Sequence, residues 1–114
     1  MLTPLVDTVV VETIEEALRI LERNGFQLIL STIAFDGSRM MDFLQAVKRT
    51  PSSSAIPFVC VRALPSVLSD RFVESTRAAC EQSGAAAFVD IAKFDHHKAQ
   101  SLLKDVLTGC LPPN

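Results

Sequence analysis

The stretch Phe26-Gln27-Leu28-Ile29-Leu30-Ser31-Thr32-Ile33 decides the fold that the sequence predicts. This apolar run has the length of a strand and is too short for a helix that is buried all round. Side chains alternate along a strand, so Leu28 and Leu30 point to one face of the sheet. Ile29 and Ile33 point to the opposite face. Both faces are apolar, which is typical of a central parallel strand covered by helices on both sides.

The carboxyl end of this strand carries two hydroxyl groups, Ser31 and Thr32, and no charge. Open α/β sheets bind their ligands at the carboxyl ends of the strands, so these hydroxyls are candidate nucleophiles. However, neither lies in a G-x-S-x-G turn with a clear base partner. Hydroxyls that end a buried strand more often bond to loop backbone, and we expect that role here.

The predicted elements alternate along the chain. Apolar runs bounded by turn residues predict strands at 8–12, 26–33, 56–61 and 85–91. The helical spacing of apolar residues predicts a helix after each strand. The order βαβαβαβα predicts an α/β fold with a four-stranded parallel sheet and right-handed crossovers. We expect the strands to lie in chain order, with 8–12 beside 26–33.

The helices have recognisable starts, ends and buried faces. We place their starts at a capping box of Thr13 and Glu16, at Ser38, at Pro65-Ser66 and at Asp95. Because glycine tolerates the left-handed turn that follows many helices, we place their ends at Asn24-Gly25, Ser83-Gly84 and Gly109. We expect three buried stripes: Met40, Phe43, Leu44 and Val47; then Leu68, Phe72 and Ala79; and finally Ala99, Leu102, Leu103, Val106 and Leu107.

Length and composition indicate a single compact domain, residues 1–114. The chain is 48% hydrophobic and 21% charged, which is ordinary for a globular protein. A net charge of −2, with no Trp or Tyr, leaves no basic or stacking surface for nucleic acid. The sequence shows no signal-peptide pattern, and no apolar run approaches the ~20 residues of a spanning helix. We expect a cytoplasmic domain that binds neither nucleic acid nor membrane.

The sequence predicts no metal site and no cofactor. Cys60, Cys80 and Cys110 are widely spaced and form no C-x-x-C pair, so we expect reduced thiols rather than a disulfide framework or zinc site. His96 and His97 are adjacent on a predicted helix and point in different directions. They therefore do not converge on a metal ion.

Three segments together resemble the receiver domain of two-component response regulators: Gly25–Leu30, Ala55–Val61 and Ser83–Val89. The likeness covers roughly residues 8–108 and includes Glu15–Leu18, which resembles the family's second helix. It implies a flavodoxin-like, three-layer sandwich. It also implies that this chain is N-terminally truncated and lacks the family's first strand and helix.

The resemblance places the family's reactive positions on residues that cannot perform its chemistry. In receivers an Asp at the end of the third strand accepts a phosphoryl group, and an acidic pair after the first strand holds magnesium. Here the acceptor position falls on Thr32, the hydroxyl switch position on Arg62 and the lysine position on Ile91. The acidic pair has no counterpart. A register slip could bring Asp36 or Lys93 nearer, but Asp36 would then lie in the loop.

Arg62 and Lys93 are candidate anion contacts at the strand ends. The alternative is that Arg62 simply pairs with Asp36 or Asp90 across a shallow cleft. Because structural ion pairs are common among charged residues in clefts, we favour the pairing.

The resemblance and the lost site together imply a degenerate pseudo-receiver. We expect a non-catalytic, phosphorylation-independent signalling module that binds an unknown signalling protein. The alternative is a small anion- or ligand-binding domain, or an unrecognised enzyme, that uses the strand ends near Thr32 and Arg62.

We also expect a homodimer. In receivers the first and last helices cover one face of the sheet, and only the helix predicted at 95–108 would do so here. Four strands span about 19 Å, whereas one helix spans about 10–12 Å. Much of an apolar face would be exposed, which usually marks an interface. The alternative is that Met1–Val6 covers the gap.

Overall fold

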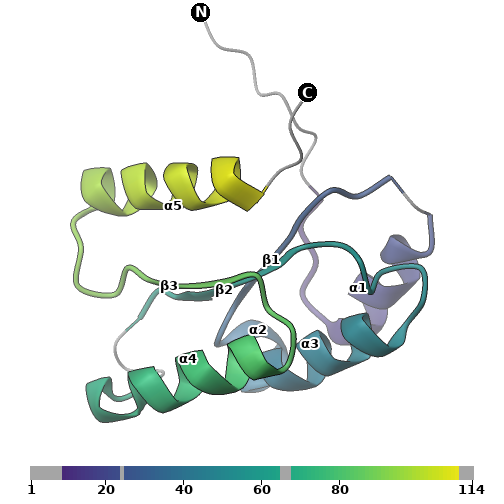
Figure 1. Cartoon of the computed structure of the whole chain (residues 1–114), viewed down its shortest axis with the longest axis horizontal. Coiled ribbons are helices and arrows are strands. Elements are labelled where there is room, and N and C mark those ends of the chain that lie inside the picture. The colour runs from purple at the N-terminus through teal and green to yellow at the C-terminus, as the bar shows by residue number, and fades with distance from the viewer. Residues whose placement is uncertain (1–8, 24, 65–67, 111–114) are drawn as a thin grey trace, which may run out of the picture.

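The computed structural model of the chain describes residues 9–23, 25–64 and 68–110. It is an α/β fold in which a three-stranded, all-parallel sheet alternates with helices (Figure 1). The strands are β1 (Ile29–Thr32), β2 (Phe58–Arg62) and β3 (Ala87–Asp90), and they lie side by side in that order. The parallel direction and the order of these three strands agree with the sequence prediction.

The predicted fourth strand at 8–12 is wrong for the part of it that the structure describes. Thr8 lies outside the described residues, and 9–12 form no strand. Val9 and Val10 are instead 53% and 84% exposed. β-branched residues favour a strand only where they pack against a neighbouring pleated surface, and these two valines have no such cover.

Helices lie on both sides of the sheet (Figure 1). Among the described helices, only α5 lies on one side. The other elements lie on the opposite side, and their bounds are α1 (Ile14–Leu21), α2 (Phe35–Ser38), α3 (Met40–Arg49), the 3-10 turn η1 (Asp70–Phe72) and α4 (Val73–Gln82). Helix α5 runs from His96 to Cys110.

Two apolar clusters, one on each side of the sheet, hold the helices against the strands. The larger one joins the strands to α1, α3 and α4, and it includes the whole predicted stripe of the second helix, Met40, Phe43, Leu44 and Val47. The smaller one consists of Val59, Val61 and Val89, against which Leu102, Leu103 and Val106 of α5 pack. Every residue of β2 is buried, so the central strand depends on cover from both clusters.

Of the buried stripe predicted for the third helix, only Leu68 packs against the larger cluster, and the other two positions are wrong. Phe72 is 50% exposed and Ala79 is exposed, whereas Val73 and Cys80 are buried. The predicted start at Pro65-Ser66 lies outside the described residues, and α4 begins only at Val73, after η1. A 3-10 turn has three residues per turn rather than 3.6. Counting α-helical positions from Leu68 through η1 therefore identifies the wrong residues of α4 as buried.

Two predicted helix caps are confirmed. The Thr13 hydroxyl accepts a hydrogen bond from the Glu16 amide at 3.2 Å, and Asp95 accepts one from the Lys98 amide at 2.8 Å. The Glu16 carboxylate reaches back to the Glu12 amide at 3.1 Å, one residue before the position that a capping box predicts.

Two other boundaries differ from the prediction. Ser38 does not cap α3, because it has a left-handed φ of 66° and Arg39 occupies the cap position. Helix α5 continues through Gly109 to Cys110, since a glycine lowers helix stability by only about 1 kcal/mol. Gly84 does end α4 as predicted, with a φ of 103° that favours glycine. Asn24 and residues 111–114 lie outside the described residues.

Replacing Leu44 with alanine tests the larger cluster. Its side chain is 0% exposed, so we expect the free energy of unfolding in urea to fall by about 2–5 kcal/mol. Leu64→Ala is the matched control, because it removes the same atoms from a side chain that is 57% exposed. The control should remain within about 0.5 kcal/mol of the wild type. Equal losses in the two variants would contradict the placement of Leu44 in the core.

Candidate functional site

The carboxyl ends of the three strands meet at one edge of the sheet. Thr32 ends β1, Arg62 ends β2 and Asp90 ends β3. Arg62 and Asp90 are direct partners in the parallel register. The sequence-predicted positions therefore do come together, as expected for parallel strands.

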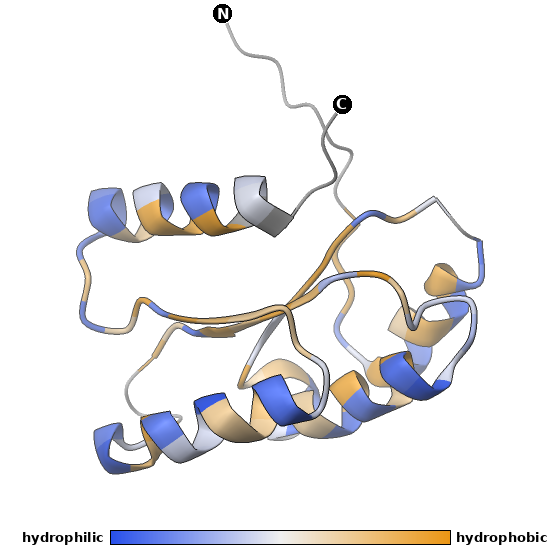
Figure 2. Cartoon of the chain, viewed as in Figure 1, coloured by the Kyte–Doolittle hydropathy of each residue, from blue (hydrophilic) through white to orange (hydrophobic). Residues whose placement is uncertain are grey.

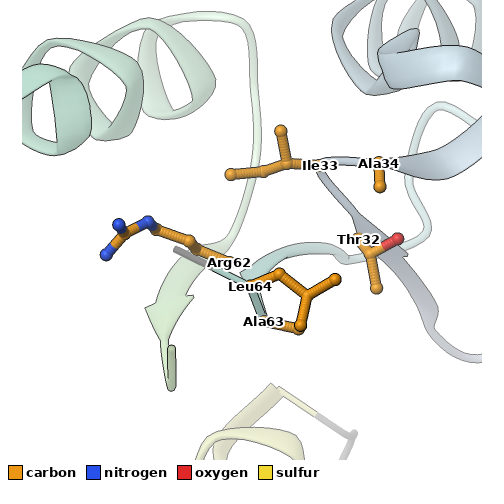
Figure 3. Close-up of a pocket in the computed structure, with 6 residues that line it drawn as sticks. All are labelled: Thr32, Ile33, Ala34, Arg62, Ala63 and Leu64. Atoms are coloured by element: carbon orange, nitrogen blue, oxygen red, sulfur yellow. The ribbon is translucent and has the colours of Figure 1, made fainter. Parts of the chain in front are cut away.

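A shallow hollow lies between the ends of β1 and β2 (Figure 3). Its volume is about 90 Å³, whereas ligand pockets usually hold about 300–1,000 Å³. In Figure 3 the guanidinium of Arg62 points away from Thr32, so that mainly the carbon chain of Arg62 borders the hollow. The lining residues are Thr32, Ile33, Ala34, Arg62, Ala63 and Leu64.

The guanidinium of Arg62 is held by three acceptor groups. Its Nη1 donates to both carboxylate oxygens of Asp90, at 3.2 and 3.0 Å. Its Nη2 donates to Asp70 Oδ1 at 2.8 Å and to the Leu68 carbonyl at 2.7 Å, and its Nε donates to the same carbonyl at 3.1 Å. The side chain is only 1% exposed. All three nitrogens are therefore engaged within the protein, and an anion would have to displace one of these bonds.

Lys93 extends this set of ion pairs. Its Nζ lies 2.6 Å from Asp70 Oδ2, so the charges run in the order Asp90, Arg62, Asp70, Lys93. Hydrogen bonds from Lys93 and then from Arg62 lower the pKa of the Asp70 carboxyl below its ordinary value. Burial alone would lower the pKa of the Arg62 guanidinium, but its bonds to Asp70 and Asp90 raise it overall.

The pairing of Arg62 with Asp90 confirms one sequence alternative, and the pairing with Asp36 is wrong. Asp36 instead accepts from the Ile14 amide at the start of α1, at 3.0 Å, and from Arg39 Nη1 at 3.4 Å. Asp70 was missed as a partner because its segment was predicted to be helix interior. One indication of this pairing was available: a buried guanidinium needs more than one acceptor.

The other candidate residues from the sequence are Ser31, Thr32 and Ile91. Ser31 is buried and its hydroxyl donates to the Thr32 carbonyl at 3.0 Å, which is the backbone role expected of it. Thr32 is exposed. Ile91 packs against the smaller apolar cluster, and its amide donates to the Arg62 carbonyl at 2.9 Å.

Metal-ligating side chains do not gather in the part of the chain that the structure describes. No three His, Cys, Asp or Glu side chains there lie close enough to hold a metal ion. His96 and His97 are exposed at the start of α5. Cys60 and Cys80 are buried free thiols, and a hydrogen bond with Cys80, together with burial, raises the pKa of Cys60.

Comparisons with protein-family models, with curated proteins and with solved structures find no match for this chain. Among the described helices none is long and apolar enough to cross a membrane. The likeness to receivers therefore rests on the sequence segments 25–30, 55–61 and 83–89.

The ion pairs of Asp70 predict a pH-dependent stability. A carboxyl with a lowered folded pKa stabilises the fold above its unfolded pKa and loses that effect as the pH falls through the folded value. We expect Asp70→Asn to unfold at lower urea concentration than the wild type at pH 7. The difference should shrink as the pH falls below the ordinary value of 3.8.

Asp105→Asn is the matched control for this measurement. Asp105 is exposed on α5, and its carboxylate makes no hydrogen bond or salt bridge with the described residues. Its replacement removes the same charge without removing an ion pair, so we expect this variant to unfold at the same urea concentration as the wild type at pH 7. A wild-type advantage over Asp70→Asn that persists unchanged far below pH 3.8 would contradict the role of the carboxylate.

Proposed function

We propose that the chain is a non-catalytic module of two-component signal transduction that acts by binding proteins, without phosphorylation. In this proposal the fold is a receiver-like, three-layer sandwich whose phosphorelay site is degenerate. The observation that carries the proposal is the closed hydrogen-bond set of Arg62, at the edge of the sheet where such chemistry would take place.

Phosphoryl transfer at this edge lacks, among the described residues, an acceptor carboxylate, a lysine at the family's position and carboxylates that are available to magnesium. The acceptor position holds the neutral hydroxyl of Thr32, and the lysine position holds Ile91. Magnesium is held by carboxylates together with phosphate oxygens. The two carboxylates near the ends of β2 and β3, Asp70 and Asp90, are already paired with Arg62. They are therefore poorly available to a metal ion.

The alternative function, an anion-binding, ligand-binding or enzymatic site near Thr32 and Arg62, has weaker support. Arg62 has no nitrogen left without an acceptor, and Lys93 is paired with Asp70. The hollow of about 90 Å³ is small for an organic ligand. Binding through an outer surface is the function that remains best supported.

Incubation with acetyl phosphate and magnesium tests the proposal. We expect the intact mass of the full chain to stay unchanged, because Thr32 cannot form an acyl phosphate. Magnesium with beryllofluoride should likewise leave the backbone amide spectrum unchanged. Thr32→Asp, which restores only the acceptor carboxylate, should also remain unmodified, because Ile91 still occupies the lysine position.

A receiver domain that is known to accept phosphate serves as the positive control in the same tube. A stoichiometric, acid-stable and base-labile gain of one phosphoryl group by the wild-type chain would overturn the proposal. Titration with inorganic phosphate distinguishes the proposed function from the alternative of an anion-binding site. Saturable shifts of the Arg62 side-chain resonance would favour an anion site, whereas we expect none.

A further inference from the structure

Strand β1 lies at an edge of the sheet and has one unpaired side. The amides of Ile29 and Ile33 donate toward β2, to the carbonyls of Pro57 and Val61, at 2.9 and 3.0 Å. Backbone groups alternate in direction along a strand, so those of Leu30 and Thr32 face away from β2. Within the described residues no strand pairs with β1 on that side.

Apart from its short length of four residues, this edge lacks the features that usually keep strand edges apart. Monomeric proteins protect such edges with charged side chains, prolines or bulges. The sequence from Phe26 to Phe35 contains no charged residue and no proline. The other edge strand, β3, ends in Asp90, and Arg77 lies over its Phe88 ring at 5.0 Å. The two edges therefore differ in charge, and only the β1 edge is neutral.

Helix α5 leaves β1 partly uncovered. Leu30 is the register partner of Val59, yet Leu30 is 44% exposed and Val59 is fully buried. Three strands span about 14 Å and one helix about 10–12 Å, so α5 covers most of this face but not its last strand. Figures 1 and 2 show the apolar side of α5 turned toward the sheet. The uncovered surface is one apolar strand, which is narrower than the sequence alone predicted.

We propose that β1 pairs antiparallel with β1 of a second copy of this chain, around a two-fold axis. Such pairing satisfies the free backbone groups of both copies and joins two three-stranded sheets into one. Leu30 of each copy would lie beside the two-fold axis and lose contact with water. The inference rests on the proposed function only in treating the chain as a binding module.

A second copy fits this edge for two reasons. In two-fold pairing β1 faces its own copy, so a charged β1 would repel its partner; β1 is uncharged although the chain carries a net charge of −2. The partner strand must also present an apolar side chain on the face that α5 leaves open, which Leu30 does. Strand pairing over the four residues of β1 extends about 13 Å and buries less than the roughly 800 Å² per partner of a standard interface. We therefore expect a dimer that dissociates in the micromolar range.

Sedimentation equilibrium of the full chain measures the assembly directly. The mass should rise with concentration from 12.4 kDa toward twice that value. Hydrogen exchange at the amides of Leu30 and Thr32 should slow over the same concentration range. A monomer at all concentrations would overturn the inference, including the case in which Met1–Val6 of the same chain, or a different protein, covers the edge.

Two pairs of variants locate the interface. Leu30→Lys should weaken dimerisation, whereas Gln45→Lys adds the same charge at an exposed site on α3 and should not. Thr32→Pro removes an outward amide and should weaken dimerisation by roughly tenfold or more, whereas Thr32→Val keeps that amide. Circular dichroism confirms that each variant is folded. If Leu30→Lys unfolds, Thr32→Pro and hydrogen exchange still determine whether β1 forms the interface.

A dimer that persists unchanged in folded Leu30→Lys and Thr32→Pro would overturn the placement at β1. These results are independent of the acetyl phosphate measurement. A monomeric chain that remains inert would contradict only the dimer, whereas a phosphorylated dimer would contradict only the proposed function.

Discussion

The buried guanidinium of Arg62 is the constraint on which the carboxyl edge of the sheet depends. A charge removed from water is costly unless its donors are all engaged. Arg62 is 1% exposed, and it meets this requirement with Asp90 from the neighbouring strand and with Leu68 and Asp70 from the following segment. That segment must therefore return to the end of β2 before α4 can begin at Val73.

The same bonds explain why this edge has so little capacity for chemistry. Catalytic and anion-binding sites need charged groups with free donors or acceptors directed at a ligand. Here the two carboxylates and both cations are directed at one another, in the order Asp90, Arg62, Asp70, Lys93. The charged groups at the strand ends thus stabilise the fold, which is why the proposed function relies on the outer surfaces.

The sequence predicted the parts of the fold that depend on interactions between residues close in sequence. The strands predicted at 26–33, 56–61 and 85–91 appear, with somewhat different bounds, as β1, β2 and β3. They, the cap at Thr13 and the stripe from Met40 to Val47 follow from burial or capping near in sequence. The pairing of Arg62 with Asp90 was also predictable, because parallel strand ends lie side by side. The phase of α4 was not predictable, because the turn at Asp70 forms around a guanidinium eight residues earlier.

The absence of the predicted strand at 9–12 also depends on contacts with distant parts of the chain. This absence leaves β1 at the edge of the sheet. Val9, Val10 and Val11 have high strand propensity, but propensity in sheets reflects packing against neighbours rather than an intrinsic backbone preference. Without that strand, β1 becomes an edge while it keeps the composition of a central strand, uncharged and apolar on both faces. An uncharged edge strand of that composition offers its free backbone groups as a template for pairing. The apolar, uncharged composition that made residues 26–33 decisive for the fold is therefore also the basis of the proposed pairing at β1.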